Sequence, residues 1–317
     1  MKNEELLNLL KTYSGQKHIN LPRGIEFDCS LEDASKPKII NMMLSTKAAY
    51  NTNMQEDESA FEAWALIFRA YFSSVEICLL LEEGKQKETE HYHRFLYRVM
   101  NFMEQYEWFH ISSFLLAEVE RFKKTLVNNA FYNNCPGKDS TKISDGSQKG
   151  IEKEYEAKFS GNHESVERRA ELCKPSEKIF SQLPVGLMKG DEKTPFFPGD
   201  SAAIDLWKIS SDHKLVIYEL KAKRKKVGIV TELMFYASYV RDMFLKDNNT
   251  WKLSPSEDGD FRGYGDLYEA CRRQELVGLE AYMLVDEIHP LLADGKVLKL
   301  MNQNSNGIVY RQKFYER

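Results

Sequence analysis

The stretches AIDLWKI (203–209) and KLVIYELK (214–221) determine how the second half of this 317-residue chain is interpreted. Each has the length and the β-branched and aromatic content of a strand, and the residues SSDH between them suit a short connection, which predicts a β-hairpin. Apolar residues at spacings of three and four behind a Thr cap predict a helix over 231–245. With a charged helix expected before the hairpin and another strand at 280–288, the order predicts an α/β core.

Ionisable residues interrupt both apolar runs. Alternation along the second strand places Glu219 and Lys221 on one face, in a segment that is otherwise apolar on both faces. Burying such charges is costly unless they pair or bind a metal. In a hairpin Asp205 approaches Glu219, and two adjacent carboxylates repel each other unless a divalent cation lies between them. Lys221 faces the same spot, where its ammonium can orient or deprotonate water, or stabilise charge on a phosphate.

The pattern D205-x13-E219-x-K221 resembles the signature of the PD-(D/E)XK nuclease superfamily, which has the restriction-endonuclease-like fold. On the following helix, ELMFY (232–236) is similar to the Gln-apolar-x-x-Tyr element of the RecB and lambda-exonuclease branch. The resemblance covers roughly residues 163–288. This chain departs from the pattern in having Ile204 before the aspartate and Glu232 where that branch has Gln.

The resemblance implies a metal-dependent nuclease that hydrolyses phosphodiester bonds. Asp205 and Glu219, together with the backbone carbonyl oxygen of Leu220, would hold Mg²⁺ or Mn²⁺. Lys221 would position or activate the attacking water, and the metal would neutralise charge on the phosphate. Glu232 is expected to contribute to catalysis as a polar group facing the nucleic acid or the metal, with a favourable position in the first turn of a helix as the alternative.

A basic run follows the predicted catalytic strand. KAKRKK (221–226) concentrates positive charge in a chain whose net charge is −4, from 44 basic and 48 acidic residues. Such a patch supplies phosphate contacts, whereas a solvated loop tip is the structural alternative. The residues predicted to bind nucleic acid are Lys223, Arg224, Lys225, Lys226 and Tyr236. Tyr236 also lies on the apolar stripe of its helix, so it fits core packing equally well.

Superfamily members often add a glutamate from the helix that precedes the strands. The chain offers several candidates there: Glu164, Glu167, Glu171 and Glu177. Glu167 and Glu171 are one helical turn apart, so both could face the sheet, and Glu167 is the one favoured. Asp200 rivals Asp205 as the first acidic ligand, but it follows Pro-Gly and has the context of a turn aspartate.

The first half is expected to be an all-helical domain. Apolar residues recur with helical periodicity over 59–83, 91–109 and 112–129. The polar segment 136–150 has the composition of a linker or long loop. The predicted organisation is therefore a helical domain over 1–135, this linker, and a nuclease-like domain over 151–317 with a mixed sheet flanked by helices.

Composition sets the remaining expectations. The Cys residues are odd in number and form no C-x-x-C, which favours reduced thiols in the cytoplasm. No apolar stretch is long enough for a membrane span, and no Walker or Rossmann glycine pattern occurs. The partner predicted is nucleic acid, with DNA favoured over RNA, in a restriction or phage-defence setting by analogy. The first half would bind substrate, a partner subunit or a second copy. The alternative is a non-catalytic module of the same fold that binds nucleic acid or protein.

Overall fold

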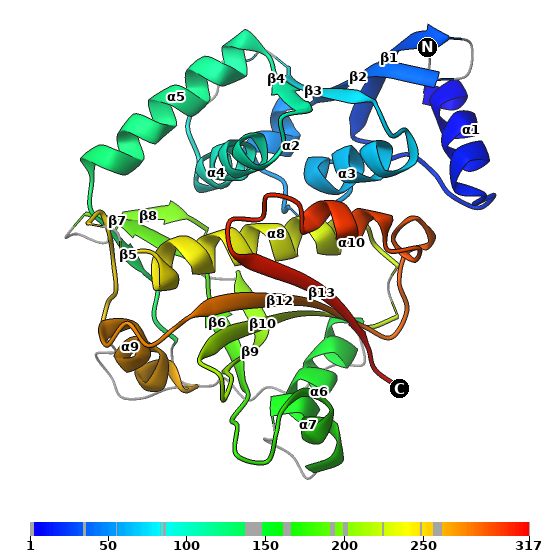
Figure 1. Ribbon diagram of the computed structural model, residues 1–317. Coiled ribbons are helices and arrows are strands. Elements are labelled where there is room, and N and C mark those ends of the chain that lie inside the picture. Colours follow the sequence, from blue (N-terminus) through cyan, green and yellow to red (C-terminus); the bar gives the residue numbers. More distant parts are fainter. Residues whose placement is uncertain are drawn as a thin grey trace. The chain divides into compact units, whose positions relative to one another are not determined.

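A computed structural model describes the backbone of most of the chain (Figure 1). The described residues are 3–33, 36–54, 56–82, 84, 87–136, 148–160, 166–190, 194–198, 202–223, 225–247, 249–255 and 262–316, without the side chains at 32–33, 148–149 and 166–168. The chain forms two compact units, each built from several segments. The first unit comprises Met1–Thr125, Lys225–Glu232 and Ile288–Asn306. The second unit comprises Leu126–Arg224, Leu233–Glu287 and Gly307–Arg317.

The first unit combines helices with a sheet. Its strands have the order β1-β2-β3-β4, with β1 antiparallel to β2 and the others parallel. The strands are β1 (Ile25–Asp33), β2 (Lys36–Leu44), β3 (Glu76–Leu81) and β4 (Phe109–Ile111). The helices are α1 (Asn3–Ser14), α2 (Thr46–Tyr50), α3 (Phe61–Tyr71), α4 (Glu90–Gln105), α5 (Ser113–Asn128), the 3₁₀ turn η2 (Pro290–Leu292) and α10 (Lys296–Met301).

The prediction of an all-helical first half is therefore wrong. Helices α3, α4 and α5 do form within the periodic segments, but the segment 59–83 is not one helix. Helix α3 ends at Tyr71, and β3 then buries every second side chain, from Ile77 to Leu81. Strand β1 also alternates, with Ile25, Phe27 and Cys29 buried. That period-2 pattern is typical of a strand with one buried face.

A buried ion pair anchors the start of α8 (Gly228–Val240) within the first unit. Glu62 and Arg98 form a bidentate pair, with Nε–Oε1 at 2.7 Å and Nη2–Oε2 at 2.6 Å, and both side chains are almost fully buried. The Thr231 hydroxyl in the first turn of α8 donates to Oε2 of Glu62 at 3.1 Å. Residues 228–232 of this helix thus belong to the first unit, and the rest of α8 belongs to the second.

The second unit is built on a mixed sheet with strand order β13-β12-β10-β9-β6. Strands β6, β9 and β10 form an antiparallel meander, and β12 and β13 continue parallel to β10. These strands are β6 (Phe180–Pro184), β9 (Ala203–Ile209), β10 (Lys214–Lys221), β12 (Gly278–Val285) and β13 (Ile308–Phe314). The predicted hairpin and the α/β class are confirmed.

Helices and a smaller sheet complete the second unit. The helices are α6 (Gln148–Ser160), α7 (Val166–Leu172), the π-helix η1 (Arg241–Leu245) and α9 (Tyr264–Arg272). The smaller sheet has the order β11-β5-β7-β8, from β5 (Phe131–Asn133), β7 (Leu187–Lys189), β8 (Thr194–Phe197) and β11 (Trp251–Lys252). Because β5 pairs with β7 and β11, residues predicted to end the first domain belong to the second unit. Most of the predicted linker, 137–147, lies outside the described residues.

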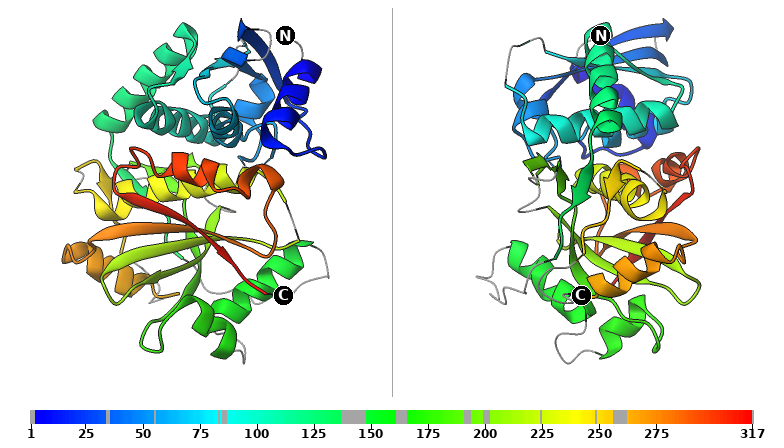
Figure 2. Two further views of the ribbon diagram at one scale, coloured as in Figure 1. Left: turned by 45° about the vertical axis from the view of Figure 1, so that its right-hand side comes forward. Right: turned by 90° about the vertical axis from the view of Figure 1, so that its left-hand side faces the viewer.

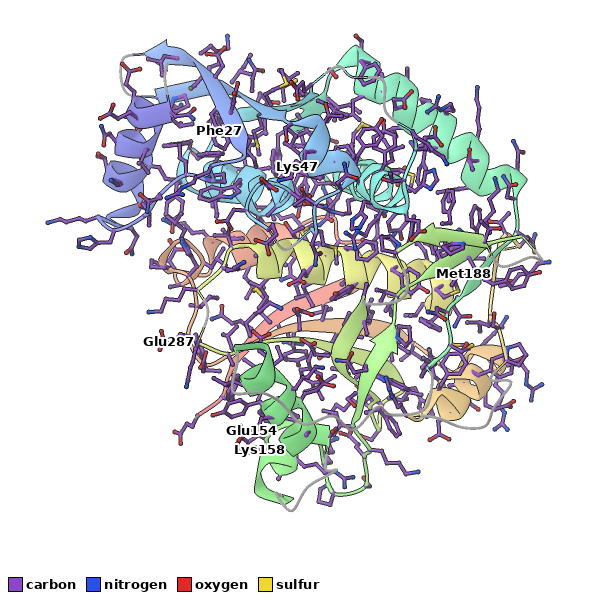
Figure 3. All side chains as sticks on the ribbon, turned by 180° about the vertical axis from the view of Figure 1, so that it is seen from behind. Phe27, Lys47, Glu154, Lys158, Met188 and Glu287 are labelled. Carbon is purple, nitrogen blue, oxygen red and sulfur yellow. The ribbon has the colours of Figure 1, made fainter. Side chains whose placement is uncertain are left out.

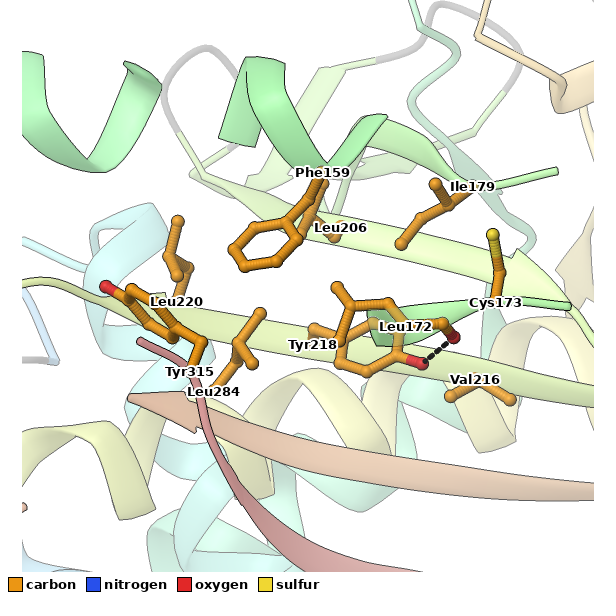
Figure 4. Packing of buried hydrophobic residues seen from close by; sticks show 10 residues of the cluster. All are labelled: Phe159, Leu172, Cys173, Ile179, Leu206, Val216, Tyr218, Leu220, Leu284 and Tyr315. Atoms are coloured by element: carbon orange, nitrogen blue, oxygen red, sulfur yellow. Dashed lines mark hydrogen bonds between the residues drawn. The ribbon is translucent and has the colours of Figure 1, made fainter. Parts of the chain in front are cut away.

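Helices α6 and α7 cover one face of the larger sheet (Figure 2). Phe159 from α6 and Leu172 from α7 pack on Leu206 of β9 and Tyr218 of β10 (Figure 4). The Tyr218 hydroxyl donates to the carbonyl oxygen of Leu172 at 3.2 Å, which satisfies a buried polar group. This packing fixes the position of α6 against the hairpin. Among the described residues, no helix combines the length and apolar character needed to cross a bilayer.

Candidate active site

The strands β9 and β10 stop pairing where the ionisable residues begin. Their ladder runs from Leu215 opposite Ile209 to Tyr218 opposite Leu206. Beyond it, Oδ2 of Asp205 accepts a hydrogen bond from the backbone N–H of Leu220 at 2.8 Å. The carboxylate thus replaces a ladder partner and lies beside the segment that carries Glu219 and Lys221, as the sequence predicted.

Glu219 and Lys221 form a buried ion pair at the end of β10. They are 2% and 5% exposed, and the Lys221 ammonium donates to Oε1 of Glu219. Pairing to β12 includes both residues and ends at Lys221, and the Tyr315 hydroxyl donates to the Lys221 carbonyl oxygen at 3.2 Å. The strand end is therefore held on several sides. Two opposite charges can be buried here because each offsets the desolvation of the other.

Glu156 of α6 is a member of this cluster that the sequence reasoning missed. Its side chain is buried, and its Oε2 accepts a hydrogen bond from Nε2 of Gln182 at 2.9 Å. Burial and then the negative charge of Asp205 raise the pKa of the Glu156 carboxyl to about 8, against smaller opposing effects that include Lys153 and Arg262. Two carboxyl groups therefore interact at this point, one from α6 and one from β9.

The prediction that a glutamate such as Glu167 joins the site from the preceding helix stays a prediction. Glu164 and the Glu167 side chain lie outside the described residues. Glu177 pairs with Lys208 instead, at 2.7 Å. The one sequence feature that could have indicated Glu156 is its spacing from Glu152, one helical turn earlier. In the structure Oε1 of Glu152 also reaches the hairpin, where it accepts from the backbone N–H of Ala222 at 3.4 Å.

Gln182 adopts an uncommon backbone conformation beside this cluster. It lies in β6 between Ser181, which pairs with Leu206, and Leu183, which pairs with Ile204. Its φ of 57° is in the left-handed region, which costs an L-residue roughly 1–2 kcal/mol. In this conformation the Gln182 side chain reaches Glu156. Strain of this kind also occurs at active sites.

The residues predicted to bind nucleic acid are dispersed. Lys223 is exposed, and its backbone N–H donates to both carboxylate oxygens of Asp286 in the second unit, at 3.1 and 3.0 Å. Arg224 lies outside the described residues. Lys225 and Lys226 belong to the first unit, where Lys226 pairs with Glu56 at 3.3 Å. The run is therefore divided between the units, and its role in phosphate binding stays a prediction.

Glu232 and Tyr236 also keep their predicted roles as predictions. Glu232 is 4% exposed in the part of α8 that belongs to the first unit. Tyr236 is equally buried in the second unit, where its ring lies 5.7 Å from that of Phe235. Burial of this ring favours the packing alternative over contact with nucleic acid. Asp200 lies outside the described residues.

The donor set at the hairpin end is suited to a hard divalent cation, although it is sparse. Among the described residues, no group of three or more His, Cys, Asp or Glu side chains is arranged to hold a metal ion. The carboxyl groups of Asp205 and Glu156 nevertheless interact, and oxygen donors are what Mg²⁺ and Mn²⁺ prefer. A cation between them would relieve the repulsion that raises the pKa of Glu156.

Comparison of the chain with protein-family models, with curated proteins and with solved structures finds no match. A functional assignment for this chain therefore depends on the geometry at the end of the β9–β10 hairpin.

Proposed function

We propose that the second unit is a metal-dependent nuclease that hydrolyses phosphodiester bonds, with DNA favoured over RNA as its substrate. The observation that carries the proposal is the hydrogen bond from the Leu220 N–H to Asp205. It brings an acid of one strand beside the Glu219–Lys221 pair of the next. Glu156 adds a further carboxyl group that interacts with Asp205.

The order of elements supports the same proposal. Helix α6 precedes the meander β6-β9-β10, and α8 leads from β10 to β12, which is parallel to β10. The acid on the second strand of this meander and the Glu-x-Lys on its third have the placement that the PD-(D/E)XK resemblance implies. We therefore propose that the second unit has the restriction-endonuclease-like fold. The resemblance suggests restriction or phage defence as its biological setting.

The residues divide the chemistry among them. Asp205 and Glu219, with the Leu220 carbonyl oxygen, would hold Mg²⁺ or Mn²⁺, and Glu156 would act as a further acid beside Asp205. A bound divalent cation supplies charge neutralisation on the phosphate and an acidified water. Lys221, held by Glu219, places its ammonium where it can orient that water or donate to a phosphate oxygen. Glu156 holds a proton near neutral pH and would release it when a cation binds beside it, since a nearby positive charge favours the ionised carboxylate.

The test is a cleavage assay with a matched acidic control. Wild-type protein is incubated with Mg²⁺ or Mn²⁺ and single- and double-stranded DNA and RNA, and Mn²⁺ binding is followed by calorimetry. Asp205→Asn should lower cleavage by about a thousandfold or more, since metal-based charge stabilisation contributes several kcal/mol, and should weaken Mn²⁺ binding strongly. Asp212→Asn removes an exposed acid from the turn of the same hairpin and should leave both unchanged.

Two results would contradict the nuclease assignment. Unchanged Mn²⁺ binding in Asp205→Asn would remove Asp205 from the site. Tight nucleic-acid binding by the wild type, without cleavage of any substrate with either metal, would identify the non-catalytic binding module instead. The presence of Asp205, Glu219 and Lys221 together supports the enzyme over that module.

A further inference from the structure

A cationic cavity lies in the second unit, next to the acidic cluster. Its volume is about 440 Å³, within the range of ligand-binding cavities. Three cations line it, and they are joined by hydroxyl groups and one aromatic ring; these residues are Arg169, Lys178, Arg262, Ser160, Ser181 and Phe180. Among the described residues that line this cavity there is no carboxylate. Its charge therefore favours an anion.

The first two cations come from α7 and from the segment before β6. Nη2 of Arg169 donates to the backbone carbonyl oxygen of Glu177 at 2.7 Å. A carbonyl oxygen fixes the guanidinium without cancelling its charge, so the remaining N–H groups can serve a planar, bidentate acceptor such as a phosphate. Lys178 is exposed and adds a flexible ammonium.

Arg262 connects the cavity with the acidic cluster. Its Nη1 donates to the Gln182 carbonyl oxygen at 3.3 Å, and Nε2 of Gln182 donates in turn to Oε2 of Glu156 at 2.9 Å. Arg262 has a φ of 53°, so it shares with Gln182 a left-handed conformation rare in residues other than glycine. Two residues with left-handed backbones thus contact each other beside the cavity.

The wall is also sterically determined. Gly263 has a φ of +73°, and a Cβ atom built on it would lie 2.3 Å from the ring of Phe180. Only glycine fits there, so the turn that presents Arg262 is pressed against β6. On α6, Ser160 follows Glu156 by one helical turn, which separates neighbouring side chains by roughly 5–6 Å. The cavity and the acidic cluster are therefore adjacent along the same helix.

We propose that this cavity binds a phosphate group of the nucleic-acid backbone that flanks the bond to be cut. The inference rests on the proposed nuclease function, and it assigns the strand-positioning role to Arg169, Lys178 and Arg262 in addition to the basic run at 221–226. Phosphate contacts fix the register of a nucleic acid on a protein without reading its sequence. The predicted subsite is accordingly indifferent to base sequence.

Another cavity of the same unit, of about 550 Å³, illustrates what the cationic one lacks. Its described lining holds four lysines and four carboxylates, so its charges balance. Lys208 pairs there with Glu177 at 2.7 Å, and Lys214 pairs with Asp212 at 2.9 Å. An anion entering it would have to displace these partners. The described lining of the cavity with Arg169, Lys178 and Arg262 contains no carboxylate, so its described charges are all positive.

The experiment measures binding separately from cleavage. Fluorescence anisotropy with labelled duplex DNA, single-stranded DNA and single-stranded RNA is recorded in EDTA over a series of salt concentrations, with inorganic phosphate as competitor. Arg169→Gln/Lys178→Gln should bind about tenfold more weakly, and its slope of log K against log salt should fall by about one to two. The control Lys158→Gln/Lys174→Gln removes the same charge and should stay within about twofold of the wild type. Its Lys158 pairs with Glu154 on the outer side of α6 (Figure 3).

The outcomes separate this inference from the proposed function. Equal affinities for the two double variants would overturn the cavity assignment and leave the nuclease proposal standing. Loss of binding in Arg169→Gln/Lys178→Gln, without metal-dependent cleavage by the wild type, would support the cavity and reject the nuclease. Binding of inorganic phosphate without binding of any oligonucleotide would overturn the inference. Lys178→Gln alone, at an exposed position, provides the same test if the double variant does not fold.

Discussion

Strand β9 carries ionisable side chains in two environments that differ sharply. Near its end, Lys208 is buried and pairs with Glu177, which also accepts the backbone N–H of Ser211 at 3.0 Å. Although burial acts to raise it, the pKa of Glu177 falls to about 2 through these hydrogen bonds. Three residues earlier, Asp205 interacts with the buried Glu156, whose pKa rises to about 8. Side chains of the same strand thus interact with one glutamate that is neutralised by a lysine and with another that is held in its neutral form.

The difference separates a structural ion pair from a candidate site. At Lys208 the fold supplies a cation and donors for the buried acid, so nothing further is required there. At Asp205 the fold brings acids together and shifts a pKa upward, which costs stability and is typical of sites that bind a cation or exchange a proton. The Glu219–Lys221 pair lies between these cases, because it is neutralised but located beside the acids.

The largest expected effect is a loss of cleavage that distinguishes the two buried lysines, Lys221 and Lys208. Lys221→Met and Lys208→Met each leave a buried glutamate without its ammonium partner, so each should lower the free energy of unfolding by roughly 3 kcal/mol. Only Lys221→Met should lower the cleavage rate, by about a thousandfold, with nucleic-acid affinity nearly unchanged. The measurements are urea unfolding, single-turnover cleavage and anisotropy binding. Equal losses of cleavage in the two folded variants would make Lys221 a structural residue like Lys208.

A smaller effect is expected in how the unfolding free energy depends on pH, which should differ between Glu177 and Glu156. The pKa of Glu177 is below its ordinary value of 4.5, so its stabilisation is present above that pH and is lost as the pH falls toward 2. The pKa of Glu156 is above 4.5, so the folded form binds the extra proton, and unfolding free energy declines as the pH rises from about 4.5 to 8. Glu156→Gln should remove that decline and stabilise the protein by a few kcal/mol at alkaline pH.

Urea unfolding over this pH range measures both effects. Glu177→Gln should instead destabilise the protein near neutral pH and flatten the loss at acidic pH. An unfolding free energy for Glu156→Gln that follows the wild type at a constant offset from pH 4.5 to 8 would show that Glu156 is ionised throughout. In that case Glu156 would be an ionised, structural carboxylate like Glu177.

The sequence predicts the fold where periodicity has one interpretation. The runs at 203–209 and 214–221 are short and bounded by turn residues, and they became β9 and β10. The segment VEICLLLEE (75–83) has an unbroken apolar run over 77–81, which suits a buried strand or a helix equally. The helical spacing of apolar residues from Phe61 to Phe72 extends the predicted helix over this segment. Pairing of β3 with β2 and β4 decided the outcome, and such long-range pairing leaves no local signal.

The site residues also differ in whether the local sequence identifies them. Asp205, Glu219 and Lys221 could be recognised because a charge within an apolar strand is locally anomalous. Glu156 lies in a helix rich in Lys and Glu, where any of its acids has the context of a solvated side chain. Arg169 and Arg262 are far from the hairpin in sequence, and they join one cavity through tertiary packing. The basic run at 221–226 was conspicuous in sequence, yet it is divided between the two units.

The smallest expected effect compares two strained residues. Gln182 beside the acids and His213 in the turn between β9 and β10 both have left-handed backbones, with φ of 57° and 60°. Replacing either with Gly relieves the backbone strain but increases the entropy of the unfolded chain, so stability should change by less than about 1 kcal/mol in both. Gln182→Gly also removes the hydrogen bond to Glu156. Because one such bond contributes about 1 kcal/mol, cleavage should fall about fivefold, whereas His213→Gly should retain full activity. Single-turnover rates decide the comparison: equal rates for the two variants would mean that the strain at Gln182 belongs to the strand and not to the site.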